Sequence, residues 1–383
     1  MNLAEYAAFY RAHLTESVLP FWLNHTLDRE HGGYFSGVDR RGQVYDPRKY
    51  VWMQARAVWT FQTLYSTFEP RPEYRNAAEL IFGFVDRYAR QGEPRVWFSL
   101  TREGAPGYFQ RKPYSAVFVA LAYASQGRVE EARTLFWQVE GWVKDPTVLG
   151  RAAGAQSQLA DIMVLALLAM ELMAVDDNPR YAEIVASSQA AVWAHRDAGS
   201  GLLLENVASR ELPEGRMVCP GSILEVAWFL LHSVEQVPNP ALEKMLLEAI
   251  LTALEFGWDQ EFGGLYYFMD LEGRPRPELE ANMKLWWPHT EAIYALVLAY
   301  TRTGDERYKV WLDRVHAYTF ATFPDAEFGE WFGYCDRRGA VATELKGGAY
   351  KCAFHVPRAL LYSIQAIERG LARGLVRDRK SVV

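Results

Sequence analysis

The sequence repeats a unit in which glycine and aromatic residues lead, through a short charged turn, into a stretch with helical spacing. Three clear copies share a glycine start and a glycine-closed turn: Gly32 to Gly42, Gly263 to Gly273 and Gly329 to Gly339. Weaker copies surround Trp97 and Gly201. The copies lie 63 to 65 residues apart, except for one gap of 104 residues between Trp97 and Gly201. A degenerate copy around Gly150 to Gln158 is expected in that gap, which gives six units.

A helical unit of this length cannot bury its apolar face alone, so its copies must stack or close on one another. The aromatic segments alternate and end in turn residues, as short hairpins do. The stretches after them have helical spacing; Trp52, Arg56 and Trp59, for example, share one helix face. The sequence therefore predicts an all-α ring of about six helix pairs, with short β-hairpins gathered at one end.

Composition agrees with one large domain. The chain has 383 residues, of which 50% are hydrophobic, and that length alone would suggest two or three domains. The repeat, however, continues to the region of residue 358 without a Ser/Gly-rich linker. We therefore predict a single domain over residues 1–383, in which residues 373–383 form a flexible charged tail.

Charge, hydropathy and cysteine content exclude several classes of protein. The net charge is −6 and the 41 basic residues are scattered, so no nucleic-acid partner is expected. The longest apolar runs are too short to span a bilayer, so no membrane contact is expected, and the first helix lacks the features of a signal peptide. Three cysteines without metal-ligand spacing fit a reducing compartment, so we expect a cytoplasmic protein with free thiols.

Aromatic residues make up 14% of the chain, including 13 Trp and 21 Tyr. Most of them are expected to pack between helices. Aromatic side chains at the mouth of a helical ring can also stack on the apolar faces of a sugar, whose hydroxyls then need charged or amide partners. The sequence therefore favours a small-molecule sugar as the binding partner.

Two histidines stand at helix starts. His289 follows Pro288, which marks a helix start, and His355 occupies a similar point of a later repeat. Arg358 shares a helix face with His355, and its charge is expected to lower the pKa of that imidazole, which would stay neutral near pH 7. A neutral imidazole can act as a general base. Spacing alone leaves the alternatives open: a capping role for His289, and a helix-start His355 beside a solvated arginine.

Six segments, in order along the chain, resemble the N-acylglucosamine 2-epimerase family. They are Lys49 to Trp59, Arg111 to Ser115, Leu204 to Val207, Lys284 to Glu291, Gly329 to Tyr334 and Phe354 to Arg358. Their Trp-Trp-Pro-His and Phe-His-Val-Pro-Arg motifs are closer to the N-acylglucosamine 2-epimerases than to the cellobiose epimerase or mannose isomerase branches. The resemblance implies an (α/α)6 barrel, which agrees with the ring predicted from the repeat. It also implies metal-independent proton transfer at C2 of an opened aldose.

The resemblance implies roles for individual residues. His355 resembles one of the family's two acid/base histidines, and His289 is considered as a replacement for the other. Arg56 and Arg358 resemble groups that bind substrate oxygens, and Glu291 resembles a carboxylate that supports a histidine or a hydroxyl. The other residues expected to contact the sugar are Trp52, Tyr114, Glu205, Glu225, Lys284, Trp287 and Trp331.

The second acid/base group is where the chain departs from the family. The family usually has Pro-Gly-His followed three residues later by Glu, whereas this chain has Pro220, Gly221, Ser222 and then Glu225. Ser222 therefore stands at the catalytic position of the missing imidazole. A serine hydroxyl cannot hold a proton in reserve near neutral pH without an adjacent base.

We expect a sugar 2-epimerase that interconverts N-acetylglucosamine and N-acetylmannosamine or a related aldose. The alternatives are an aldose–ketose isomerase acting on a neutral sugar, a glycoside hydrolase or lyase with two carboxylates flanking a groove, and a weakened sugar-binding or protein-binding relative. No metal and no required cofactor are expected, because neither metal-ligand spacing nor a phosphate loop is present. ATP, which stimulates some members of the family, is considered as an activator, and a homodimer is considered as the assembly.

Overall fold

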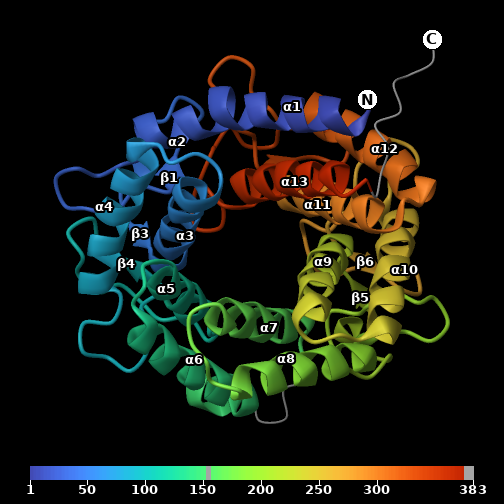
Figure 1. Cartoon of the computed structure of the whole chain (residues 1–383), viewed down its shortest axis with the longest axis horizontal. Helices are drawn as coiled ribbons and strands as arrows, with labels where there is room; N and C mark the ends of the chain where they lie inside the picture. The colour runs from blue at the N-terminus through green and yellow to red at the C-terminus, as the bar shows by residue number, and fades with distance from the viewer. Residues whose placement is uncertain (152–156, 375–383) are drawn as a thin grey trace.

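The computed structural model describes residues 1–151 and 157–374 as a closed ring of helices in two layers (Figure 1). The inner layer contains α3 (Val51–Thr67), α5 (Tyr114–Ser125), α7 (Leu159–Met173), α9 (Pro220–Gln236), α11 (Trp286–Thr303) and α13 (His355–Ala372). The outer layer contains α1 (Leu3–His13), α2 (Leu19–His25), α4 (Pro72–Tyr88), α6 (Val129–Lys144), α8 (Arg180–Ala191), α10 (Pro240–Gly257) and α12 (Glu306–Thr322). Each inner helix packs against the next, and α13 returns to α3 and α1, which closes the ring. The predicted ring of six helix pairs, an (α/α)6 barrel, is confirmed.

The arrangement of apolar residues along each helix explains whether it lies in the inner or the outer layer. In α5, every residue from Ser115 to Ala124 is buried, because one face meets the ring interior and the other meets the outer helices. The buried residues of α4, by contrast, recur every three to four positions, from Tyr74 through Ile81 to Val85, and leave its opposite face to solvent. No helix in the two described ranges is long and apolar enough to cross a membrane.

Short antiparallel strands connect the helices. β1 (Gly37–Val38) pairs with β2 (Val44–Asp46) around the first repeat turn, as a local hairpin should. The other pairs are β3 (Lys49–Tyr50) with β4 (Ser99–Leu100), β5 (Met217–Val218) with β6 (Met269–Asp270), and β7 (Lys284–Leu285) with β8 (Tyr334–Cys335). These three pairs join neighbouring units, whereas single antiparallel bridges, such as Leu100 with Pro106 and Cys335 with Val341, close the local turns. The predicted hairpins are therefore present, and pairs between units accompany them.

A buried ion-pair motif ties neighbouring units together. Three aspartates that open glycine turns each contact a buried lysine: Asp28 with Lys49 at 2.9 Å, Asp259 with Lys284 at 3.1 Å, and Asp325 with Lys346 at 3.0 Å. Each aspartate also binds an arginine of the following repeat turn: Arg102 at 3.0 Å, Arg337 at 2.9 Å and Arg40 at 2.7 Å, respectively. Because Arg40 lies in the first unit and Asp325 in the last, this third pair joins the two ends of the ring.

We expect Asp325→Asn to lower the free energy of unfolding by about 3–5 kcal/mol, because it leaves the buried Lys346 ammonium without its carboxylate. Burial raises the pKa of Asp325, but hydrogen bonds from Arg40 and Lys346 outweigh that effect and hold it well below the usual range. Denaturant unfolding measures the change, and the exposed Asp177→Asn is the matched control. A loss of less than about 1 kcal/mol would mean that the pair contributes no more than a surface ion pair.

Two of the expectations fall partly outside the described residues. The degenerate repeat expected around Gly150 to Gln158 includes residues 152–156, and the expected flexible tail includes residues 375–383. The three cysteines, Cys219, Cys335 and Cys352, are buried free thiols, as expected.

Candidate active site

A cavity of about 470 Å³ lies within the ring, between the first turns of the inner helices and the connecting loops. Its walls are largely aromatic: Trp52, Tyr114, Phe118, Phe229, Tyr267, Phe268, Trp286, Trp287, Tyr334 and Tyr350. Five charged or ionisable side chains also line it: Arg56, Glu225, Glu280, His355 and Arg358. The volume and the mixture of flat apolar walls with a few polar groups are typical of a small-molecule site.

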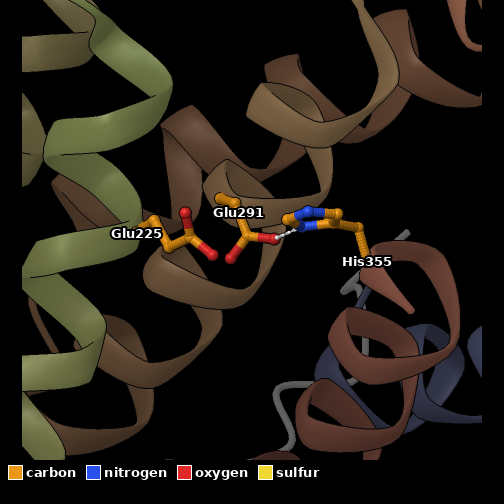
Figure 2. Close-up of side chains that lie close together, drawn as sticks. All are labelled: Glu225, Glu291 and His355. Atoms are coloured by element: carbon orange, nitrogen blue, oxygen red, sulfur yellow. Dashed lines mark hydrogen bonds and ion pairs between the residues drawn. The ribbon is translucent and has the colours of Figure 1, made fainter. Parts of the chain in front are cut away.

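Three helices bring the central polar groups together. Figure 2 shows Glu225 from α9, Glu291 from α11 and His355 from α13 pointing toward one another. His355 Nδ1 lies 2.7 Å from Glu291 Oε1. Arg358, one turn after His355, places Nη2 2.8 Å from Glu225 Oε1 and 2.8 Å from Glu291 Oε1. A proline in the first turn of each helix fixes these starts.

The contacts of His355 define its protonation. Glu291 accepts hydrogen bonds from Arg358 and from Trp228 Nε1, which lies 2.8 Å from Oε2, so its carboxylate acts as an acceptor throughout. His355 Nδ1 must then carry the proton, which leaves Nε2 as the acceptor nitrogen. Burial, and secondly the Arg358 charge, hold the pKa of His355 well below its ordinary value. The imidazole is therefore neutral at physiological pH, as the sequence predicted, although burial contributes more than Arg358.

The Arg56 guanidinium has no carboxylate partner among the residues that the structure describes. Its charged group lies over the rings of Phe118 and Trp52, at 4.0 and 4.5 Å from their centroids, and its Nε is buried without a hydrogen-bond partner in the described part of the chain. Burial lowers the pKa of Arg56 to about 10, which still leaves it charged at neutral pH. An unpaired cation in a cavity wall favours a ligand with a polarised or anionic oxygen.

The structure brings most of the predicted site residues together. Those that line the cavity are Trp52, Arg56, Tyr114, Glu225, Trp287, His355 and Arg358. Glu291 is buried directly behind His355. The sequence reasoning did not single out Tyr267, Trp286 or Tyr334 as wall residues, although all three belong to the aromatic segments of the repeat or to the Trp-Trp-Pro-His motif.

His289 does not belong to the cavity. Its side chain is fully buried, Nδ1 lies 2.6 Å from the Leu285 carbonyl oxygen, and Nε2 accepts a hydrogen bond from the Leu265 backbone N–H at 3.0 Å. Burial lowers the pKa of His289 to about 3, so it stays neutral. Both ring nitrogens are occupied, and the interpretation of His289 as a replacement second base is wrong.

Two further expected sugar contacts are wrong for similar reasons. Lys284 is fully buried in the ion pair with Asp259. It stabilises the packing of the ring and does not line the cavity. Trp331 is also fully buried, donates from Nε1 to His13 Nε2 at 2.7 Å and stacks on Phe323. Both residues hold neighbouring units together.

Glu225, Glu291 and His355 are also the group of metal-ligating residues that the described residues contain, with one candidate ligand atom each within 4.8 Å of one another. The Arg358 guanidinium already bridges the two carboxylates at 2.8 Å. A divalent cation would have to compete with this fixed positive charge, so the set does not fit a metal well. Metal-independent chemistry remains a prediction.

Comparison with known proteins agrees with this geometry. Residues 33–359 match the family N-acylglucosamine 2-epimerase (GlcNAc 2-epimerase). The chain is 39% identical to the N-acylglucosamine 2-epimerase of Rattus norvegicus, over 94% of this chain and 91% of that protein. Among solved structures, the cellobiose 2-epimerase of Bacillus thermoamylovorans has the same fold, with a TM-score of 0.82 and 19% identity over 96% of this chain and 100% of the other. A D-mannose isomerase also shares the fold, with a TM-score of 0.82 and 20% identity over 94% and 97% of the two chains. The chain thus belongs to the N-acylglucosamine 2-epimerase family.

Proposed function

We propose that this protein interconverts N-acetylglucosamine and N-acetylmannosamine by moving the proton at C2 of the open-chain sugar. The observation that carries the proposal is His355, a neutral imidazole in a sugar-sized cavity whose Nδ1 is tied to Glu291 and whose Nε2 is left as the acceptor. The 39% identity to the rat N-acylglucosamine 2-epimerase supports the choice of an N-acylated sugar.

The chemistry needs a base at C2 and positive charge near O1. The C2–H bond is weakly acidic because it is adjacent to the aldehyde carbon, and removal of its proton moves negative charge onto O1 as an enediolate forms. His355 Nε2 is the acceptor for that proton. Arg56 and Arg358, which both line the cavity and each have a buried Nε without a protein partner among the described residues, would stabilise the oxyanion.

A proton NMR experiment in deuterated water tests this proposal. The protein, first dialysed against a strong chelator, is incubated separately with N-acetylmannosamine, mannose and lyxose. We expect N-acetylmannosamine to become N-acetylglucosamine that carries deuterium at C2, at the rate of the undialysed protein. A ketose from mannose or lyxose, with no turnover of N-acetylmannosamine, would replace the epimerase with an isomerase. A rate lost on dialysis and restored by Mn²⁺ would overturn the metal-independent mechanism.

The cysteines bear on the cellular compartment of the enzyme. The free, buried thiols are compatible with a reducing compartment, and we propose a cytoplasmic enzyme that needs no cofactor. ATP as an activator and a homodimer as the assembly remain predictions.

A further inference from the structure

Inversion at C2 requires two proton transfers, one on each face of the carbon. A proton must leave one face of the carbon and a proton must arrive on the other, and His355 serves one face only. The family's second imidazole is replaced by Ser222, and His289 faces away from the cavity. The second proton must therefore come from another group.

Glu205 lies on the opposite side of the ring from His355. In the ring order α3, α5, α7, α9, α11 and α13, the helix opposite α13 is α7, as Figure 1 shows. The Glu205 backbone carbonyl accepts a hydrogen bond from the N–H of Leu159, the first residue of α7, at 2.9 Å. Glu205 thus stands at the head of α7, whereas His355 is the first residue of α13.

Within the described chain, the carboxyl group of Glu205 lacks a hydrogen-bond partner for one of its two oxygens. Its Oε1 is buried and makes no hydrogen bond with any residue that the structure describes. Burial raises the pKa of Glu205 to about 7, with a smaller opposing effect from the Ser222 hydroxyl beside it. A carboxyl group in this state holds or releases a proton near neutral pH, which is the property that a serine hydroxyl lacks.

Glu205 and Ser222 lie beside residues that line the cavity. Burial raises the pKa of Tyr114 and of Tyr267, which both line the cavity, and the Glu205 charge adds to both shifts. Ser222 lies one turn before Glu225 on the same face of α9, and Glu225 also lines the cavity. Of the other carboxylates near the sugar site, Glu225 is bound to Arg358 and Glu291 is bound to both Arg358 and His355. Glu280 also lines the cavity but is exposed to solvent.

We propose that Glu205 is the second proton-transfer group of this enzyme and that the Ser222 hydroxyl carries its proton to C2. The inference rests on the proposed epimerase activity. In one direction, His355 Nε2 takes the C2 proton and the electron pair enters the enediolate. The enediolate C2 then takes a proton from the Ser222 hydroxyl as that hydroxyl takes one from Glu205. The turnover ends with a protonated His355 and an ionised Glu205, and the reverse reaction or exchange with water restores the starting state.

The test separates inversion from exchange. Glu205→Gln cannot release a proton, so we expect its rate of N-acetylmannosamine to N-acetylglucosamine conversion to fall by about 10²-fold or more. His355 remains, so one of the two epimers should still exchange its C2 hydrogen for deuterium without becoming the other. Ser222→Ala should show the same separation. Glu211→Gln, an exposed change in the same loop, is the matched control and should convert like the wild type.

A rescue variant guards against a purely structural effect. Ser222→His introduced into Glu205→Gln supplies an imidazole of its own, and we expect inversion to return by about tenfold or more relative to Glu205→Gln. Glu205→Gln with inversion within about threefold of the wild type would overturn the proposal, as would loss of exchange in both epimers from a folded protein. Full inversion in Ser222→Ala would overturn the relay. A wild type that does not convert N-acetylmannosamine would overturn the proposed function instead, so the two failures are distinguishable.

Discussion

His355→Ala is expected to lower the rate of conversion between the two epimers by at least about 10²–10⁴-fold, because the general base on one face of C2 is removed. Binding of the sugar should persist, since the aromatic walls and Arg56 are unchanged. Deuterium exchange at C2 of either epimer measures the chemistry, and calorimetric titration with N-acetylglucosamine measures the binding. Exchange should be lost in the epimer whose C2 hydrogen faces His355, because Arg358 cannot replace the imidazole as a base. The other epimer should still exchange through Ser222 and Glu205, which is the reverse of the pattern expected for Glu205→Gln.

The control is His25→Ala, which removes an exposed imidazole outside the cavity and should leave the rate unchanged. A His355→Ala protein that keeps about a third or more of the wild-type rate would show that His355 is structural. Such a result would also remove the basis for a two-group mechanism, since no other neutral imidazole lines the cavity among the described residues.

Periodic and local features of the chain could be predicted from its sequence. The ring follows from a repeat whose copies cannot fold alone, and that reasoning needs no distant contact. The pairing of His355 with Arg358 follows from a separation of three residues on one helix. The glycine turns were also predictable, because Gly42, Gly104, Gly273 and Gly339 all have φ between 72° and 101°, where other residues are strained.

Contacts between units could not be predicted in this way. Lys284 and Asp259 lie 25 residues apart, and nothing local shows that this lysine points into the ring wall rather than the cavity. The sequence aligns His289 with His355 because both follow a repeat into a helix. The helices differ, however: His355 is the first residue of α13, whereas His289 is the fourth of α11, and Trp286 holds the first position there. A shift of three residues keeps the side chain on nearly the same side of the helix but moves it about 4.5 Å along the axis. There His289 bonds to the backbone of Leu265 and Leu285.

The contact between Glu291 and His355 joins helices 64 residues apart in sequence and controls how the base works. In the structure, Glu291 Oε1 receives both the His355 Nδ1–H and the Arg358 Nη2–H, while Oε2 receives the Trp228 Nε1–H. Every group around this carboxylate is therefore a donor. A glutamine at position 291 has one acceptor oxygen and one NH₂, so either orientation sets an NH₂ against a donor.

Glu291→Gln is therefore expected to lower kcat by about 10²–10⁴-fold while the Kd for the sugar changes by less than about threefold. When the NH₂ faces His355, Nδ1 must accept, the proton moves to Nε2 and the nitrogen facing C2 can no longer act as a base. In the other orientation the tautomer survives, but the imidazolium that forms during turnover loses its counter-charge, and Trp228 Nε1–H meets an NH₂.

Nitrogen-15 NMR of the imidazole distinguishes these states, because a change of tautomer exchanges the shifts of the two ring nitrogens. Glu79→Gln, an exposed change on α4, is the control. A Glu291→Gln enzyme with wild-type kcat would mean that Arg358 and burial alone keep His355 in its reactive form, and Glu291 would then only position the arginine.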